Sequence, residues 1–406
     1  ALLSRVIEVN RLAIEEEREL SKEEQTFWSV AVRYLRKKLA AEGIELPLIK
    51  DNMQTKTVSA DVIEARFPSD EPILLSSSAV TTFYNNQYKY FLQYVLGLQE
   101  VETIHPDARN HGTYLHRVFE LVMKDDSNHS FDSKLDKAIQ TTNLEDDFKF
   151  VYEEDEESRY SLTVLEDIAR STATILRDDA QIQVESEEET FELMIANSVR
   201  IRGIIDRVDR LSDGSLGIVD YKSSRNTFDI QKFYNGLSPQ LVTYVQALRD
   251  KKGLSESEHI FGAMYLHMQE PKVDLSSVAT TEKILENLAK ELTYRGLFLE
   301  DEKAYLANGR YHLNDSLYSQ EELEILLAYN QNLYLKAAEQ IKKGHFLINP
   351  YSEDGKSVQG DQLKAITRFE ADRHMPYARK WYKLPRKDRR QGFLSLMQEE
   401  EETDDL

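Results

Sequence analysis

The chain has 406 residues, of which 41% are hydrophobic and 30% charged, so it can bury the core of one large domain or two modest ones. It contains no cysteine, which excludes disulfides, thiolate zinc sites and cysteine-ligated iron–sulfur clusters and fits a reducing cytoplasm. No apolar run approaches the roughly 18 residues of a membrane span, and the first residues lack both an initiator methionine and a signal layout. We therefore expect a cytoplasmic fragment of a longer polypeptide that makes no contact with a membrane.

The formal net charge of −21 is unfavourable for binding a polyanion, but the charge is unevenly distributed. Acidic residues are concentrated in three runs, at 144–160, 184–192 and 398–406. Basic residues are concentrated between Arg379 and Arg390, around Trp381 and Tyr382. This stretch is compatible with a single-strand channel, with a contact to an acidic partner and with a disordered tail, and the sequence leaves these alternatives open.

In chain order, helical periodicity covers the first ~40 residues and is followed by an irregular, proline-containing stretch at 46–73. Three further helical patterns then follow, at about 78–98, 111–125 and 161–178. The period then changes from 3.6 to 2, which predicts a meander of strands over 190–211 and 216–224 with the turn SDGS between them. A helix at 238–253, a strand at 259–269 and two closing helices, the second at 319–344, complete the pattern.

This order of elements predicts an α/β fold with a small central mixed sheet flanked by helices, and with long helical segments before and after it. No internal repeat is present. We expect three regions: 1–74 as a helical region with a linker, 75–395 as the domain that contains the sheet, and 396–406 as an acidic disordered tail.

Two neighbouring predicted strands each carry an acidic residue near their ends, Asp206 and Asp220. Lys222 is two residues beyond Asp220, so both side chains leave the same face of the second strand. Carboxylates can hold Mg²⁺, and a lysine beside them can orient water or balance charge on phosphorus, as phosphodiester hydrolysis requires. A Lys222 salt bridge to a cross-strand acid is the simpler alternative for a D-x-K triplet by itself. Because Asp206 joins the triplet, we favour a site.

The segments GIID, DYK, QLVTY and GTYLH together resemble the RecB-like branch of the PD-(D/E)xK nucleases. The resemblance implies a restriction-endonuclease-like fold in which Asp206, Asp220 and Lys222 are catalytic. It also implies that Gln240 and Tyr244 form the Q-x-x-x-Y motif of this branch. The implied ligands of Mg²⁺, or of Mn²⁺ in its place, are His116, Asp206, Asp220 and the backbone carbonyl of Tyr221.

The role of several nearby residues is left open or assigned to structure. Glu120 is one helical turn after His116 and is either its hydrogen-bond partner or a plain surface acid. Asp209 is on the strand face opposite to Asp206 and is expected to be structural, and His111 is expected to be a residue of the helix start. Residues 223–225 are either phosphate contacts or an ordinary loop.

From about Ser76 onwards the chain resembles, more narrowly, the C-terminal nuclease region of the AddB/RexB family of bacterial helicase–nuclease subunits. Many members of this family hold an iron–sulfur cluster with four cysteines. The corresponding positions here are Asn86, Val358, Asp361 and Thr367, none of which is a thiolate ligand. The resemblance is therefore to the RexB type without the cluster, in which packing must hold these parts together.

The resemblance implies an exonuclease that resects double-strand DNA ends for recombinational repair by cutting the 5′-terminated strand. Its substrate would be a single strand unwound from a duplex end, and its partner an AddA/RexA-type helicase–nuclease subunit. The alternative is a DNA-binding or scaffold module that keeps the fold without turnover. A stand-alone exonuclease is a third possibility, which the helical segment before the nuclease region disfavours.

Overall fold

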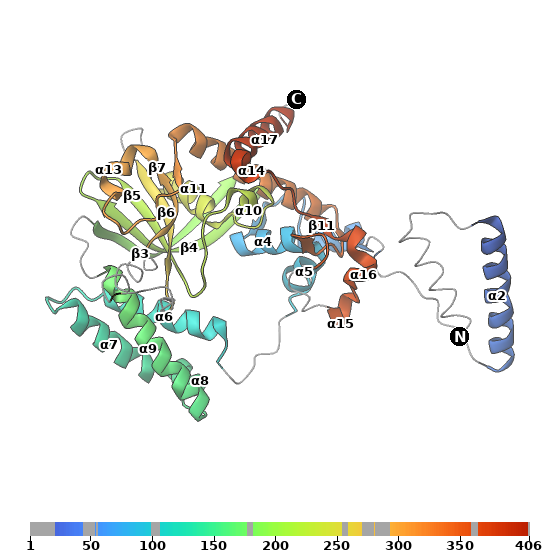
Figure 1. The fold of residues 1–406 in the computed structure, drawn as a ribbon, viewed down its shortest axis with the longest axis horizontal. Helices are drawn as coiled ribbons and strands as arrows, with labels where there is room; N and C mark the ends of the chain where they lie inside the picture. Colours follow the sequence, from blue (N-terminus) through green and yellow to red (C-terminus); the bar gives the residue numbers. More distant parts are fainter. Residues whose placement is uncertain are drawn as a thin grey trace. The chain divides into compact units, whose positions relative to one another are not determined.

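The structure is a computed structural model that describes residues 21–43, 53, 56–98, 106–176, 182–253, 259–269, 280, 293–358 and 364–404. The chain divides into two compact units (Figure 1). The first unit comprises 1–56 and 347–380, and the second comprises 57–346 and 381–406. Among the residues described, no helix has the length and apolar character needed to cross a membrane.

The first unit contains one long helix and a small parallel sheet. α2 (Lys22–Ala41) begins at a capping box in which Ser21 and Glu24 each accept the backbone N–H of the other. The small sheet pairs β10 (Tyr351–Ser352) with β11 (Arg379–Lys380). Three short helices complete this unit: α15 (Lys364–Thr367), α16 (Ala371–His374) and η5 (Met375–Tyr377). The first 20 residues of the helix expected here are outside the part that the structure describes.

The second unit is built on a mixed seven-stranded sheet in the order β2-β4-β5-β6-β7-β8, with β3 paired to the other edge of β4. Its strands are β2 (Ile73–Leu75), β3 (Ile182–Ile195), β4 (Val199–Leu211), β5 (Leu216–Lys222), β6 (Ile260–His267), β7 (Arg295–Leu299) and β8 (Leu317–Tyr318). β3, β4 and β5 form the antiparallel meander that the period-2 pattern predicted, whereas β5 and β6 are parallel.

β4 changes its partner along its length. Its first residues, Val199–Ile201, pair in parallel with β2, and its last residues, Arg207–Arg210, pair antiparallel with β5. Along the other edge it pairs with β3 from one end to the other. The hairpin turn between β3 and β4 has positive φ at both Ala196 and Asn197, which matches the right-handed twist of the strands.

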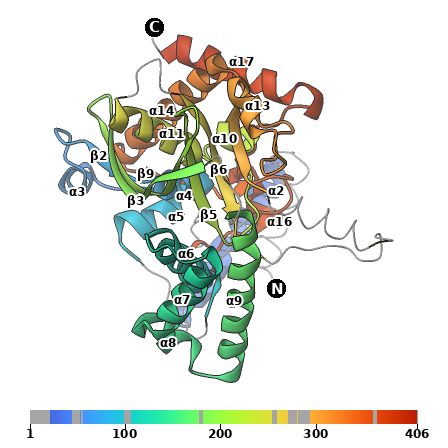
Figure 2. The ribbon, with the colours of Figure 1, turned by 90° about the vertical axis from the view of Figure 1, so that its left-hand side faces the viewer.

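Helices cover both faces of the sheet (Figures 1 and 2). On one face, α6 (Ala108–Met123), α7 (Phe131–Leu144), α8 (Asp146–Tyr152) and α9 (Glu156–Leu176) enclose one apolar core. On the other face, α4 (Ser77–Asn85), α11 (Gln240–Lys252), α14 (Gln320–Lys342) and α17 (Arg389–Asp404) enclose a second one. The predicted α/β class, a central mixed sheet flanked by helices, is confirmed.

Smaller elements connect these layers. They are β1 (Lys56–Thr57), α3 (Ala60–Arg66), α5 (Gln87–Tyr90), η1 (Phe91–Val95), α10 (Ile230–Tyr234), η3 (Glu300–Glu302), α13 (Lys303–Leu306), β9 (His345–Phe346) and η6 (Arg386–Asp388).

Two segments differ from the expected pattern. The helical pattern at 78–98 is divided at Asn86, whose side chain accepts the N–H of Tyr88 and so caps a new helix, and it ends in a π-helical turn. The expected disordered tail from residue 396 is helical as far as Asp404. The domain boundaries drawn from the sequence stay predictions. Among the cluster positions, Asp361 lies outside the described residues.

Candidate active site

Asp206 and Asp220 lie side by side at the point where β4 and β5 diverge. The register pairs Arg207 with Val219, so the next position on each strand carries one of the two acids. The Asp206 carboxylate accepts the backbone N–H of Tyr221 at 2.7 Å, which fixes it against the neighbouring strand. The hairpin therefore brings the two acids together as its turn sequence predicted.

The carboxylate of Asp220 is held from two sides. The Lys222 ammonium is 2.6 Å from one oxygen, and the Gln240 amide donates to the other at 2.8 Å. The same amide is 2.9 Å from the hydroxyl of Tyr244, one turn later on α11. Asp220 itself is 1% exposed, so these contacts replace the water that the carboxylate has lost.

His116 reaches the site from α6 on the other side. One ring nitrogen, Nε2, is 2.9 Å from the Tyr221 carbonyl, and the other, Nδ1, is 3.6 Å from the Asp206 carboxylate. Both the imidazole and the carbonyl oxygen thus adjoin the carboxylate of Asp206. The structure brings together every residue that the sequence placed in the site.

One further acid, Glu188 on β3, lies beside these residues and was not predicted from the sequence. The ligand atoms of His116, Glu188 and Asp206 all lie within 4.8 Å of one another. Glu188 has a positive φ of 46°, and its neighbours pair with those of Asp206, so the two acids lie opposite each other on adjacent strands. Glu188 belongs to the acidic run at 184–192, and such a run usually indicates a solvated surface. Glu188 and Asp206 are equally far in sequence from Asn197 at the hairpin turn. This symmetry is the signal that could have identified Glu188.

Burial controls the protonation of this cluster. It raises the pKa of Asp206 and of Asp220 to about 6 each, against the effect of the nearby Lys222. It also raises the pKa of Glu188 and lowers that of His116. Burial thus disfavours the charged forms of all four groups, and a cation among them would stabilise the carboxylates.

These donors fit a hard divalent cation. Carboxylate and carbonyl oxygens are the ligands that Mg²⁺ and Mn²⁺ prefer, and an imidazole is acceptable to Mn²⁺ as well. His116, Glu188 and Asp206 supply such donors within one small volume, the Tyr221 carbonyl adjoins His116, and Asp220 is on the neighbouring strand beside Asp206. The chemistry of the donor set therefore agrees with the metal that the sequence predicted.

Two glycines of the sequence motifs permit close packing. A Cβ on Gly203, in GIID, would lie 2.7 Å from the ring of Phe191, its cross-strand partner on β3. A Cβ on Gly112, in GTYLH, would lie 3.4 Å from the Ser223 hydroxyl oxygen, so α6 passes close to the end of β5 at this point. The first contact packs the hairpin, and the second places the helix of His116.

A buried arginine supports the site from within the core that α6 covers. Arg207 is 2% exposed and donates to Asp209 at 2.8 Å, to the Tyr221 hydroxyl at 3.1 Å and to the Tyr294 hydroxyl at 2.9 Å. Because Tyr221 contacts Asp206 and His116 through its backbone, this network fixes the part of the chain that orients them. The structural role predicted for Asp209 agrees with this ion pair.

The remaining candidates have other contacts. Glu120 makes ion pairs with Arg117 at 2.9 Å and Lys124 at 2.6 Å, which favours the surface-acid alternative. His111 is in the first turn of α6, and its ring stacks on Tyr152. Ser223 lines the site cleft.

Asp206 and Glu188 line a cleft of about 670 Å³ between α6, α8, the middle of β4 and the end of β5. Besides the site residues, Arg109, Thr113, Arg117 and Phe148 line it. Arg117 is bound to Glu145 at 2.7 Å, which joins α6 to the start of α8 along one wall. The cleft gives a polymeric substrate access to the metal ligands and to Lys222.

Comparisons with known proteins agree with this geometry. A family model described as the PD-(D/E)XK nuclease superfamily matches residues 74–357. A protein of Streptococcus mutans serotype c, named as a subunit of an ATP-dependent helicase/deoxyribonuclease, is 72% identical over 100% of this chain and 38% of its own length. Proteins of the same name are 65% identical in Streptococcus agalactiae serotype Ia, over 100% of this chain and 38% of theirs, and 59% identical in Streptococcus equi subsp. zooepidemicus, over 98% and 37%. The chain thus spans 38% of the length of the first of these relatives, and it belongs to the PD-(D/E)XK nuclease superfamily.

Proposed function

We propose that this chain is the metal-dependent DNA exonuclease domain of a helicase–nuclease that resects double-strand DNA ends for recombinational repair. The observation that carries the proposal is that His116, Asp206 and Lys222 line one cleft, while the buried Asp220 pairs with Lys222 beneath it. A structural ion pair would need only Asp220 and Lys222. It would not explain why His116 and Asp206, whose side chains can also bind a metal, lie beside this pair.

In the proposed reaction, water attacks phosphorus, a P–O bond to the leaving nucleotide breaks, and the leaving oxygen takes up a proton. Mg²⁺, or Mn²⁺, supplies Lewis acidity that polarises a phosphoryl oxygen and acidifies water. Its proposed ligands are His116, Asp206, Asp220 and the Tyr221 carbonyl, with Glu188 beside them. These side chains would hold the metal with little rearrangement, because they are already packed close together.

Lys222 is proposed to act on the water or on the charge that develops at phosphorus. Its ammonium is fixed by the ion pair of 2.6 Å to Asp220, so it donates hydrogen bonds from a defined position. Gln240 orients the second oxygen of Asp220, and Tyr244 holds Gln240. These two residues are thereby proposed to keep the carboxylate in its ligating orientation.

The substrate is proposed to be a single strand unwound from a duplex end, cut on the 5′-terminated strand. The names of the Streptococcus relatives, which describe a helicase/deoxyribonuclease subunit, support an assembly with a helicase. An AddA/RexA-type subunit as partner, cutting of the 5′-terminated strand and a cytoplasmic location are carried over from the family resemblance.

The test is degradation of end-labelled single-stranded DNA by the purified chain in Mg²⁺ or EDTA. We expect Mg²⁺-dependent cleavage that falls by at least about 100-fold in Asp220→Ala and in Lys222→Ala. Asp250→Ala and Lys232→Ala, which change exposed residues of α11 and α10, are the matched controls and should cleave normally. Circular dichroism checks that each variant is folded.

Titration with Mn²⁺, followed by its electron paramagnetic resonance signal, distinguishes metal binding by Asp220 from the proposed action of Lys222 on water or phosphorus. We expect Asp220→Ala to lose the metal and Lys222→Ala to keep it. If the folded, unmutated chain binds DNA but does not cleave it, with or without an added helicase subunit, the scaffold alternative replaces the proposal.

A further inference from the structure

One half of the sheet leaves a face exposed beside the active site. Side chains alternate along β4, and Val199, Ile201 and Ile205 are buried in the core. The residues between them, Arg200, Arg202 and Ile204, are on the other face, which is also the face of Asp206. Three residues on β4 thus form a line that ends at a proposed metal ligand.

The strand register extends this line into a surface, which we call the outer face. The outer face consists of Arg200, Arg202 and Ile204 with their cross-strand neighbours, namely Leu74 and Met194 beside Arg200, Glu192 beside Arg202 and Thr190 beside Ile204. Its apolar side chains are about half exposed to solvent: Leu74 is 54% exposed, Ile204 46% and Met194 43%. Glu188 and Asp206 follow between the pairs Glu189–Ile205 and Glu187–Arg207, so the outer face continues into the active site.

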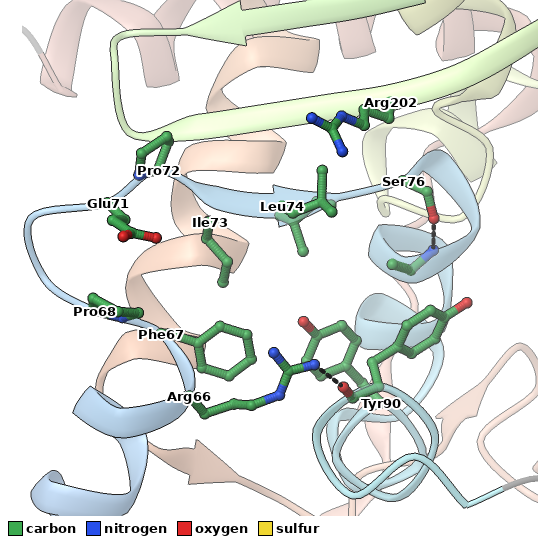
Figure 3. A pocket seen from close by; sticks show the side chains of 13 residues that line it. Arg66, Phe67, Pro68, Glu71, Pro72, Ile73, Leu74, Ser76, Tyr90 and Arg202 are labelled. Carbon is green, nitrogen blue, oxygen red and sulfur yellow. Dashed lines mark hydrogen bonds between the residues drawn. The ribbon is translucent and has the colours of Figure 1, made fainter. Parts of the chain in front are cut away.

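At the far end, the outer face adjoins a cavity of about 450 Å³ (Figure 3). Arg66 and Arg202 lie on opposite sides of Leu74 there, and Phe67, Tyr90 and Tyr94 add aromatic rings to the lining. The Arg66 guanidinium is 5.2 Å from the Phe67 ring, and its hydrogen bond to the Tyr94 carbonyl is long, at 3.4 Å. Phe67 and Tyr94 are half-buried and Tyr90 is buried, and arginines beside partly exposed aromatic and apolar groups are typical of a surface that binds unpaired nucleotides.

We propose that the outer face is a track for single-stranded DNA that connects the active site to this cavity. The proposal rests on the nuclease function proposed above and adds the path of the substrate to it. Arg66 and Arg202 contact backbone phosphates, and the cavity receives an unpaired base. Arg202 is four residues from Asp206, which is about 13 Å along a strand, so a strand longer than the scissile nucleotide spans the distance.

Charge favours DNA over polypeptide as the occupant. The chain carries a formal charge of −21, yet three arginines meet at the track, where Glu192 pairs with Arg202 at 2.7 Å and more weakly with Arg200 at 3.9 Å. Among the residues that line the cavity, Glu71 is the one acid. A segment of protein that merely covered the apolar groups would not require a surplus of arginine, nor continuity with the cleft of the metal ligands.

The test is fluorescence anisotropy with labelled oligothymidylates of increasing length, in Mg²⁺, on a Lys222→Ala background that preserves the substrate. We expect Arg66→Ala and Arg202→Ala to weaken binding of the longer oligonucleotides several-fold. Each should also reduce the slope of log affinity against log salt by about 0.7, the loss of one phosphate contact on a single strand. Arg202→Lys should recover most of the affinity, because it keeps the charge.

Arg249→Ala is the matched control, because Arg249 is an exposed arginine in an ion pair of 2.7 Å with Glu324, on a helix that packs against the other face of the sheet. Unchanged affinity and salt slope in both track variants, or an equal loss in the control, overturns the track. Weaker binding of an added helicase subunit with normal DNA binding also overturns it and identifies a protein-binding face. Cleavage by the unmutated chain is scored separately, so the track and the nuclease can fail independently.

Discussion

At the scale of single residues, two acids far from the metal ligands form a hydrogen bond at the turn of the hairpin that carries the site. Glu302 on η3 is 7% exposed and hydrogen-bonds to Asp213 in the turn between β4 and β5. Asp213 in turn accepts the N–H and the hydroxyl of Ser215, at 2.9 and 2.7 Å. Burial, the Asp213 hydrogen bond and the Asp213 charge raise the pKa of Glu302 to about 7.

This pKa gives the chain a stability that depends on pH. The folded pKa of Glu302 is above its ordinary value of 4.5, so between pH 4.5 and 7 the folded chain keeps a proton that the unfolded chain loses. The free energy of unfolding therefore decreases as pH rises through this window. Glu302→Gln should remove the decrease, because its amide donates to Asp213 at any pH.

Urea denaturation of the metal-free chain checks this expectation. Allowing for partial solvent screening, we expect the variant to be more stable by about 1 kcal/mol at pH 8 and equal to the unmutated chain at pH 5. An equal difference at both values would show that the effect is steric and does not come from titration.

At the scale of elements, the hairpin of β3 and β4 sets the register of the site. Its turn holds Ala196 at a φ of 45° and Asn197 at 53°. Asparagine tolerates this left-handed region, whereas alanine is strained there because of its Cβ. The rest of the hairpin therefore maintains a turn that glycine would form more easily.

Ala196→Gly should stabilise the chain by about 0.5–1 kcal/mol, since relief of the strain exceeds the added freedom of the unfolded chain. The midpoint of urea denaturation measures it. Ser198→Gly, two residues later and also exposed, is the control and should not stabilise. A lower midpoint for Ala196→Gly would mean that the turn is not strained.

The sequence predicted those elements whose pattern is local. The alternation over β3, β4 and β5 and the spacing of Asp220 and Lys222 are such patterns, and both are found. Glu188 could not be recognised in the same way, because its position depends on which residues of β4 lie opposite it. Its neighbours are also acidic, and composition alone suggests a solvated surface there.

Other elements were missed for a different reason. β7 has five residues and β8 has two, which is too short for a clear periodicity. β7 pairs with β6, which is distant in sequence, and with the short β8. The break at Asn86 was hidden because apolar residues continue on both sides of it, and only the capping contact to Tyr88 interrupts the helix. Tertiary pairing and side-chain capping, rather than composition, decided these cases.

At the scale of the whole molecule, the chain has a net negative charge and also buries a cluster of acids. Each acid of the cluster loses solvation on folding, and the charge of Lys222 offsets only part of this loss at Asp206 and Asp220, whose pKa values stay raised. A bound divalent cation should therefore stabilise the folded state as well as serve the reaction.

Differential scanning calorimetry with Mn²⁺ tests this coupling. At a free concentration 100 times the dissociation constant, the metal should stabilise the fold by about 2.7 kcal/mol and raise the unfolding temperature accordingly. Asp220→Ala should show no such increase, and Asp250→Ala should show all of it. A similar increase in Asp220→Ala would place the stabilising metal elsewhere.

The pairing of β4 with β3, which extends over the length of both strands with one register shift between Val184 and Ser186, has a mechanical consequence. The two strands are hydrogen-bonded from Ile182 and Leu211 at one end to Ile195 and Val199 at the other, and the bonds run perpendicular to the strands. A polymer drawn along β4 would load this ladder in shear, so that many bonds resist together. Loaded across the strands, the same bonds would break one at a time, as in peeling. The strand pair that carries the proposed ligands therefore resists a force along β4 better than a force across it.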